Sequence, residues 1–75
     1  MRFSKGMKVV KIINVFGVET ASIQQVCAVN KRKGFVYTDE DDICDDGQNT
    51  YRDGDGTANV CWISGCHHRI VPIEE

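Results

Sequence analysis

The residue types best suited to chemistry gather in one stretch, Cys61-Trp62-Ile63-Ser64-Gly65-Cys66-His67-His68. Thiolate and imidazole groups are the ligands that zinc prefers, and the gap between Cys61 and Cys66 is at the upper limit for a zinc knuckle. In an extended strand the adjacent histidines point to opposite faces, so only one of them can join Cys66. A second knuckle is missing, and we therefore expect core thiols beside imidazoles at the rim, with no metal or other cofactor. A zinc site, if formed, would combine Cys44, Cys61, Cys66 and His67, and Cys27 could also help to complete the set.

An acidic run is the second candidate, because six of the nine residues at positions 39–47 are acidic. Carboxylates this dense repel one another, so we expect an exposed loop. The calcium-loop pattern is not matched, because Ile43 stands between the acidic pairs and Gly47 comes too late. A row of carboxylates also resembles the phosphates of a nucleic acid and could dock on a basic protein surface. The alternative is a loop that only keeps the protein in solution. The acidic residues are Asp39, Glu40, Asp41, Asp42, Asp45 and Asp46.

A basic cluster precedes this run and suggests a different partner. Lys31, Arg32 and Lys33 could contact phosphates, and Phe35 and Tyr37 could stack on bases, as in small nucleic-acid-binding barrels. Residues 1–34 carry a net charge of +6 and residues 35–75 a net charge of −8, which together give −2. This acidic balance opposes tight non-specific binding to nucleic acid. A solvated hairpin tip is the simpler interpretation.

Catalysis has little support in the sequence. Cys66 lies next to His67, but a nucleophile and its base meet through the fold and not as chain neighbours. No glycine-rich phosphate loop, nucleophile elbow or dinucleotide fingerprint is present. A chain of 75 residues has little room for a substrate pocket of about 300 Å³. We therefore expect a protein that is not an enzyme.

The elements that must position these residues are mostly strands in a single domain, residues 1–75. Residues 7–16 are rich in β-branched side chains and predict a strand. Its apolar residues occupy both faces, so either both faces are covered or a bulge switches the inward face. Residues 20–33 allow two interpretations. Ser22 and Gln25 form a capping-box pattern for a helix. Alternatively, residues 23–30 and 35–38 are the arms of a hairpin that turns at residues 31–34, which the β-rich context favours.

The second half of the chain predicts further short strands. Residues 48–52 form one, and Asp53-Gly54-Asp55-Gly56 is a strong turn signal. Strands at residues 58–63 and 69–73 follow, joined by a turn at residues 64–65. Pro72 lacks an N–H group and belongs at a sheet edge or a strand end. Five or six strands in so short a chain predict an all-β fold, a small antiparallel barrel. With a helix at about 20–33 the fold would be α+β.

This layout resembles the SH3-like barrel proteins of bacteriophage genomes. The resemblance rests on Lys5-Gly6-Met7-Lys8-Val9, Gly34-Phe35-Val36-Tyr37-Thr38-Asp39, Tyr51-Arg52-Asp53-Gly54 and Arg69-Ile70-Val71-Pro72. Cys66-His67-His68 lies outside the pattern. The resemblance implies an accessory role, since some small phage proteins block the defence or nucleic-acid enzymes of their host.

We therefore expect a non-catalytic protein-binding module, an inhibitor whose acidic loop meets a basic surface on a host nucleic-acid enzyme. Tyr51 and Trp62 would be its apolar anchors. One alternative is a nucleic-acid-binding module that uses Lys31, Arg32, Lys33, Phe35 and Tyr37. Another is a self-associating assembly protein, such as a homodimer, formed through the two-faced strand at residues 7–16. No secretory signal or membrane span is evident, so we expect a cytoplasmic protein, in the host cell if phage-encoded, with reduced thiols.

Overall fold

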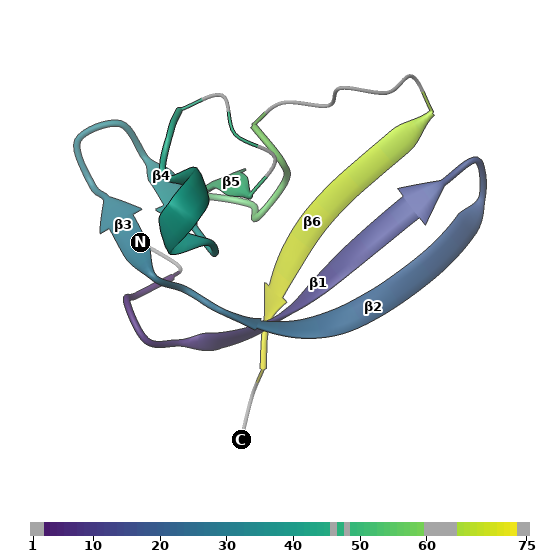
Figure 1. Ribbon diagram of the computed structural model, residues 1–75, viewed down its shortest axis with the longest axis horizontal. Coiled ribbons are helices and arrows are strands. Elements are labelled where there is room, and N and C mark those ends of the chain that lie inside the picture. The colour runs from purple at the N-terminus through teal and green to yellow at the C-terminus, as the bar shows by residue number, and fades with distance from the viewer. Residues whose placement is uncertain (1–2, 46, 48, 60–64, 74–75) are drawn as a thin grey trace.

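The computed structural model describes residues 3–45, 47, 49–59 and 65–73. These residues form six strands and one short 3₁₀ helix, with no α-helix among them (Figure 1). The all-β prediction is confirmed for this part of the chain. The elements in chain order are β1 (Lys8–Val15), β2 (Val18–Gln25), β3 (Ala28–Asn30), β4 (Phe35–Tyr37), η1 (Glu40–Asp42), β5 (Thr50–Arg52) and β6 (Cys66–Pro72).

The strands form two antiparallel three-stranded sheets, with the orders β2-β1-β6 and β3-β4-β5. The strand predicted at residues 7–16 is confirmed as β1, the central strand of the first sheet. Its register with β2 runs unbroken from Lys8↔Gln25 to Val15↔Val18, so no bulge switches its faces. Only Val9 of this strand is fully buried, because β1 extends well beyond the compact core.

The helix considered for residues 20–33 is wrong. These residues lie in β2, β3 and the turn that follows, because β2 pairs with β1 along its whole length. Phe16 and Gly17 connect the two strands with φ values of 49° and 88°, as a two-residue type I′ turn requires. Asn14 Oδ1 accepts a hydrogen bond from Gly17 N at 3.0 Å and holds this turn. The predicted hairpin between residues 23–30 and 35–38 is confirmed in its paired part, β3 with β4.

The last strand begins earlier than predicted, at Cys66, and ends at Pro72. Its position at a sheet edge and a strand end confirms the prediction for Pro72. The strand predicted at residues 58–63 falls mostly outside the described residues. Ala58 forms an isolated bridge with Tyr51.

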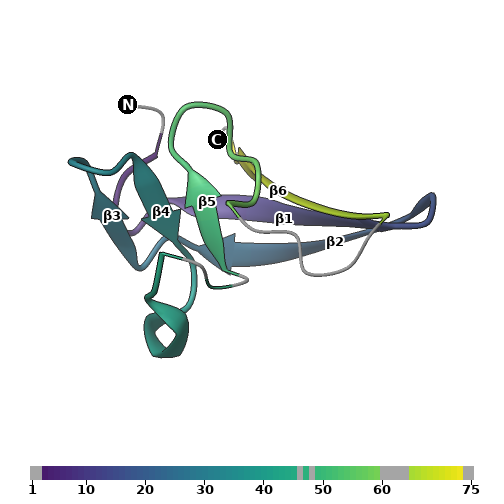
Figure 2. The same ribbon diagram turned by 90° about the horizontal axis from the view of Figure 1, so that it is seen from above.

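Backbone contacts join the two sheets at two places, one after β2 and one at β6. Cys27 follows β2, and its N–H group donates to Tyr37 O of β4 at 2.9 Å. The chain that leaves the first sheet at the end of β2 therefore pairs with β4 of the second sheet. Thr57 forms a bridge with Arg69 of β6. Figure 2 shows the short strands β3, β4 and β5 at one end of the longer strands. A closed SH3-like barrel stays a prediction.

A small core fills the space between the sheets. Gly56 lies against β6 so closely that a Cβ atom there would be 2.3 Å from Ile70 O. Its φ of 74° also favours glycine. Among the described residues, the fully buried apolar core consists of Phe3, Val9, Val26, Val36, Tyr51 and Ile70.

In the described part of the chain, no helix has the length and apolar character needed to cross a membrane.

Candidate protein-binding site

The acidic segment, defined here as residues 39–45, is an excursion between β4 and β5. Asp39 has an extended backbone, and its side chain accepts a hydrogen bond from Asp41 N at 3.0 Å. This N-cap starts the single turn of η1, because it satisfies a backbone donor that the turn leaves unpaired. Asp39, Glu40 and Asp41 are exposed, and Figure 2 shows η1 projecting away from both sheets. The predicted exposure of these three residues is confirmed.

The far end of the acidic segment is tied to β5. Cys44 O accepts hydrogen bonds from Thr50 Oγ1 at 2.6 Å and from Gly47 N at 3.1 Å. At the base of the excursion, Thr38 N donates to Asn49 O at 3.1 Å. Both ends of the segment are therefore fixed to the sheet, and the exposed side chains of Asp39, Glu40 and Asp41 lie between these two attachment points.

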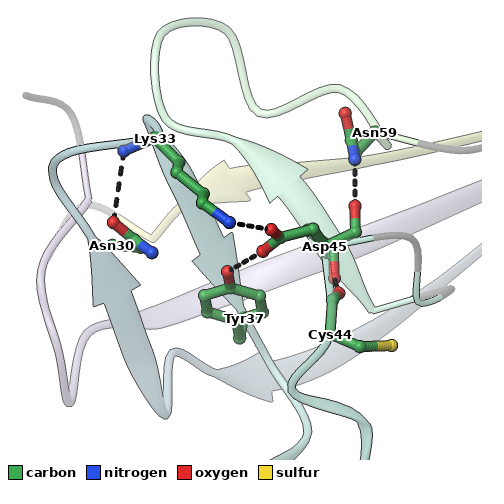
Figure 3. A network of polar contacts seen from close by, with 7 residues as sticks. Asn30, Lys33, Tyr37, Cys44, Asp45 and Asn59 are labelled. Carbon is green, nitrogen blue, oxygen red and sulfur yellow. Dashed lines mark hydrogen bonds and ion pairs between the residues drawn. The ribbon is translucent and has the colours of Figure 1, made fainter.

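Asp45 connects the acidic segment to the turn between β3 and β4 (Figure 3). Its carboxylate pairs with Lys33 Nζ and accepts a hydrogen bond from the Tyr37 hydroxyl at 2.8 Å. Its backbone oxygen accepts a hydrogen bond from Asn59 Nδ2. Asn30 Oδ1 accepts from Lys33 N at 3.1 Å and holds the turn from which Lys33 extends.

These contacts shift the titration of both acids in the network. The Lys33 ammonium, and then the Tyr37 hydroxyl, lower the pKa of Asp45. Burial, and then the Asp45 carboxylate, raise the pKa of Tyr37. At neutral pH this tyrosine is therefore a hydrogen-bond donor to an ionised carboxylate, which is the stronger kind of hydrogen bond.

The basic and acidic clusters, predicted as separate surfaces, thus contact each other. Lys33 is engaged with Asp45, and Tyr37 is buried. The prediction that Tyr37 offers a stacking face for bases is wrong, because its ring lies inside the domain. Phe35 is half-buried, whereas Lys31 and Arg32 are exposed. The nucleic-acid surface therefore loses one aromatic ring and shares one of its three cations.

The structure describes one of the two predicted apolar anchors, Tyr51. The prediction for Tyr51 is wrong, because its side chain is 0% exposed in the core. Trp62 and Asp46 lie outside the described residues, and Asp42 is the final residue of η1. Ile43, an apolar residue with no sequence signal for binding, is 49% exposed within the acidic segment.

Within the described residues, the cysteines and histidines do not gather into the set that we considered as an alternative zinc site. Cys66 is buried, and its Sγ lies 2.9 Å from His68 Nε2 rather than next to His67. Residues two apart on a strand share a face, so His68 joins Cys66 while His67 is exposed on the opposite face. Burial, and then the Lys11 charge, lower the pKa of His68.

Cys44 is exposed on the acidic segment, and Cys61 lies outside the described residues. No three metal-binding side chains converge within the residues that the structure covers. No disulfide joins Cys27, Cys44 and Cys66 to one another. The Cys27 thiol donates to Tyr37 O at 3.3 Å, and burial raises its pKa.

Sequence reasoning missed the supporting residues Asn30, Thr50 and Asn59. Only Asn30 carried a signal, because asparagine commonly begins a turn by accepting from a nearby backbone N–H. Asn59 and Thr50 act across tertiary contacts with no local pattern. Comparison of the chain with models of protein families, with curated proteins and with solved structures finds no match.

Proposed function

We propose that this protein is a non-catalytic binding module whose acidic segment docks on a basic surface of another protein. One observation carries the proposal: Asp39, Glu40 and Asp41 are exposed on an ordered turn that projects from the sheets. Complementary charge speeds encounter and fixes orientation more than it adds affinity. The preferred target is a surface that normally binds nucleic acid, such as that of a host nucleic-acid-processing or defence enzyme, which the module would inhibit by occupying it.

Preorganisation supports this role. A flexible acidic loop loses conformational entropy when it binds, whereas this segment is held at both ends before binding. The Thr50–Cys44 hydrogen bond holds one point, and the Asp45 contacts with Lys33 and Tyr37 hold another. Asp45 is ionised at neutral pH, and its lowered pKa extends this ionisation to more acidic conditions.

Ile43 is the apolar anchor that we propose in place of Tyr51. Ile43 is the residue directly after η1, and 49% of its surface is exposed. An exposed apolar residue on an acidic segment suits a basic surface that also has an apolar depression. Such a central contact usually carries much of the affinity, while the surrounding charges exclude wrong partners.

We also propose that the two sheets belong to one small SH3-like barrel. The contact from Cys27 to Tyr37 and the bridges Tyr51↔Ala58 and Thr57↔Arg69 support it, because they connect the sheet edges in sequence. Such a barrel would hold in place β4 and β5, the two strands between which the acidic segment lies.

The test compares the wild-type protein with the double variant Glu40→Lys and Asp41→Lys as baits in bacterial lysate. We expect the wild type to capture a protein that the variant does not capture, that high salt releases, and that duplex DNA displaces. The matched control reverses two exposed cations of the β3–β4 turn with Lys31→Glu and Arg32→Glu, and it should capture the same protein. Equal capture by wild type and the acidic-segment variant would refute the proposal. So would loss of capture with the control alone.

A further inference from the structure

Strand β2 forms an exposed edge of the larger sheet. Figure 1 shows it at the outer margin, on the side of β1 away from β6. Within the described residues, β1 is the only strand paired with it. Its residues are exposed except Gln24, and Val18 and Ile23 keep 68% and 72% of their surface exposed.

The hydrogen bonds assign a direction to each backbone group of this edge. Phe16 N donates to Gly65 O at 3.0 Å, so even-numbered positions of the β1 strand face β6 and odd-numbered positions face β2. The register Val15↔Val18 then directs the even-numbered residues of β2 toward β1. Glu19, Ala21 and Ile23 therefore direct their N–H and C=O groups outward.

The same edge already pairs with a strand further along the chain. Cys27 N donates to Tyr37 O, and β3 continues the ladder with β4. The unpaired portion is the part of the edge before Cys27. It lacks the usual protection against strand pairing, since β2 has no proline, lysine or bulge. Its single charge, Glu19, lies 3.8 Å from Arg69 of β6.

We propose that β2 pairs with β2 of a second copy of this chain, antiparallel and about a twofold axis at Ala21. In this register Ala21 faces Ala21 of the second copy, and Glu19 faces Ile23 of the second copy. Both pairs use the outward-directed backbone groups reciprocally. Small side chains at the axis allow the strands to approach to normal sheet distance, about 4.8 Å.

Two features favour this occupant and this register. The hairpin end of the second copy, at its Gly17, then lies opposite Gln25 and stops before Cys27, where β4 already occupies the edge. The two Glu19 carboxylates are separated by four residues along the strands, about 14 Å, which exceeds the ~8 Å screening length at physiological salt. The charges of the edge therefore do not oppose pairing.

The size of the contact predicts a reversible dimer. The eight residues of β2 span about 27 Å, and one added strand buries less than the ~800 Å² per partner of a standard interface. Association should therefore depend on concentration. This inference is independent of the proposed function, because β2 and the acidic segment are different surfaces.

Sedimentation velocity of the full chain, from low micromolar to near-millimolar concentration, measures the association. Ala21→Lys and Ala21→Glu place like charges opposite each other, and each should weaken association by at least about tenfold. An equimolar mixture of the two variants should restore the dimer, because opposite charges then meet at the axis. Matched changes at exposed Ser4, to Lys and to Glu, should have no effect.

Amide exchange tests the wild type without substitution. The amides of Glu19, Ala21 and Ile23 should gain protection as concentration rises, whereas Thr20 and Ser22, which face β1, should stay equally protected. Three results would overturn the proposal: a wild type that stays monomeric throughout, variants that associate like the wild type, or a mixture that stays monomeric. Protection of the outward amides that does not change with concentration would also overturn it.

Discussion

Replacing Tyr51 by phenylalanine should stabilise the protein, although Tyr51 is the largest fully buried side chain among the described residues. The Tyr51 ring is fully buried, and its hydroxyl has no hydrogen-bond partner among the described residues. The buried Thr38 hydroxyl also has no hydrogen-bond partner among these residues. It lies close enough to Tyr51 to lower its pKa, against the larger effect of burial, but outside hydrogen-bonding geometry.

The size of the effect follows from the missing bond. A buried polar group without a partner costs about 1–3 kcal/mol, whereas removing a hydroxyl that is well hydrogen-bonded usually loses about 1 kcal/mol. Phenylalanine keeps the packing of the ring and removes the unpaired oxygen. We therefore expect Tyr51→Phe to raise the free energy of unfolding at pH 7 by about 1 kcal/mol.

The same hydroxyl predicts a loss of stability in alkali. Burial raises the pKa of Tyr51 to about 12, above a value of about 10 in the unfolded chain. A group whose pKa is raised by folding contributes its full stability below the unfolded value and loses it as the pH rises through the folded value. Two pKa units correspond to about 2.7 kcal/mol, lost between pH 10 and pH 12. Tyr51→Phe should reduce this loss. The remaining slope should include contributions from Tyr37 and Cys27, whose pKa values are also raised.

Urea unfolding followed by circular dichroism, at pH 7 and at steps from pH 9 to pH 12, measures both effects. Tyr37→Phe is the control, because its hydroxyl donates to Asp45 and its removal should lower the stability at pH 7. The reasoning is refuted if Tyr51→Phe lowers the free energy of unfolding by 1 kcal/mol or more, as expected for a hydrogen-bonded hydroxyl. It is also refuted if the alkaline loss is the same with and without the Tyr51 hydroxyl.

Three further predictions concern single positions. Gly56→Ala should destabilise by about 2 kcal/mol or more, because the new Cβ would meet a backbone oxygen at 2.3 Å and φ is 74°. Gly54→Ala, which meets nothing within 4 Å, should change thermal stability by less than about 0.5 kcal/mol. Lys33 lowers the pKa of the Asp45 carboxylate, so this group should contribute its full stability above about pH 4 and lose it as the pH falls through the lowered value. Asp45→Asn should therefore flatten the acid limb of the pH–stability profile. His68, whose pKa is lowered by burial, should destabilise the fold as the pH falls below about 6.5, and His68→Gln should remove that slope in urea titrations.

Long elements with strong local signals were predictable from the sequence. β1 is marked by β-branched residues, and the β3–β4 turn is marked by Asn30 and Gly34. The segment at 20–33 was ambiguous because Ser22 and Gln25 satisfy a helix-capping pattern. Pairing with β1 decides in favour of strand, since β1 would otherwise lose its partner on that side.

The candidate site was predictable only in part. Local charge density predicted that Asp39, Glu40 and Asp41 are exposed. It gave no sign that Lys33 lies against Asp45, because that contact depends on how the β3–β4 turn folds toward the loop after β4. Tyr51 was placed wrongly because β5 has three residues, too few for alternation to show which side chain points inward.

The pairing of β1 with both of its neighbours has a consequence for the order in which the chain folds. The β1–β2 hairpin joins residues that are close in sequence, so it can close within about 1–10 μs. The β1–β6 ladder joins Val9 to Pro72 and must first overcome the entropy of closing a long loop. During synthesis the hairpin therefore has time to close many times before β6 has left the ribosome, although an isolated two-stranded hairpin is only marginally stable. Until then the edge of β1 that β6 later covers is open to other strands, so chaperone binding to nascent chains should be strongest in that interval.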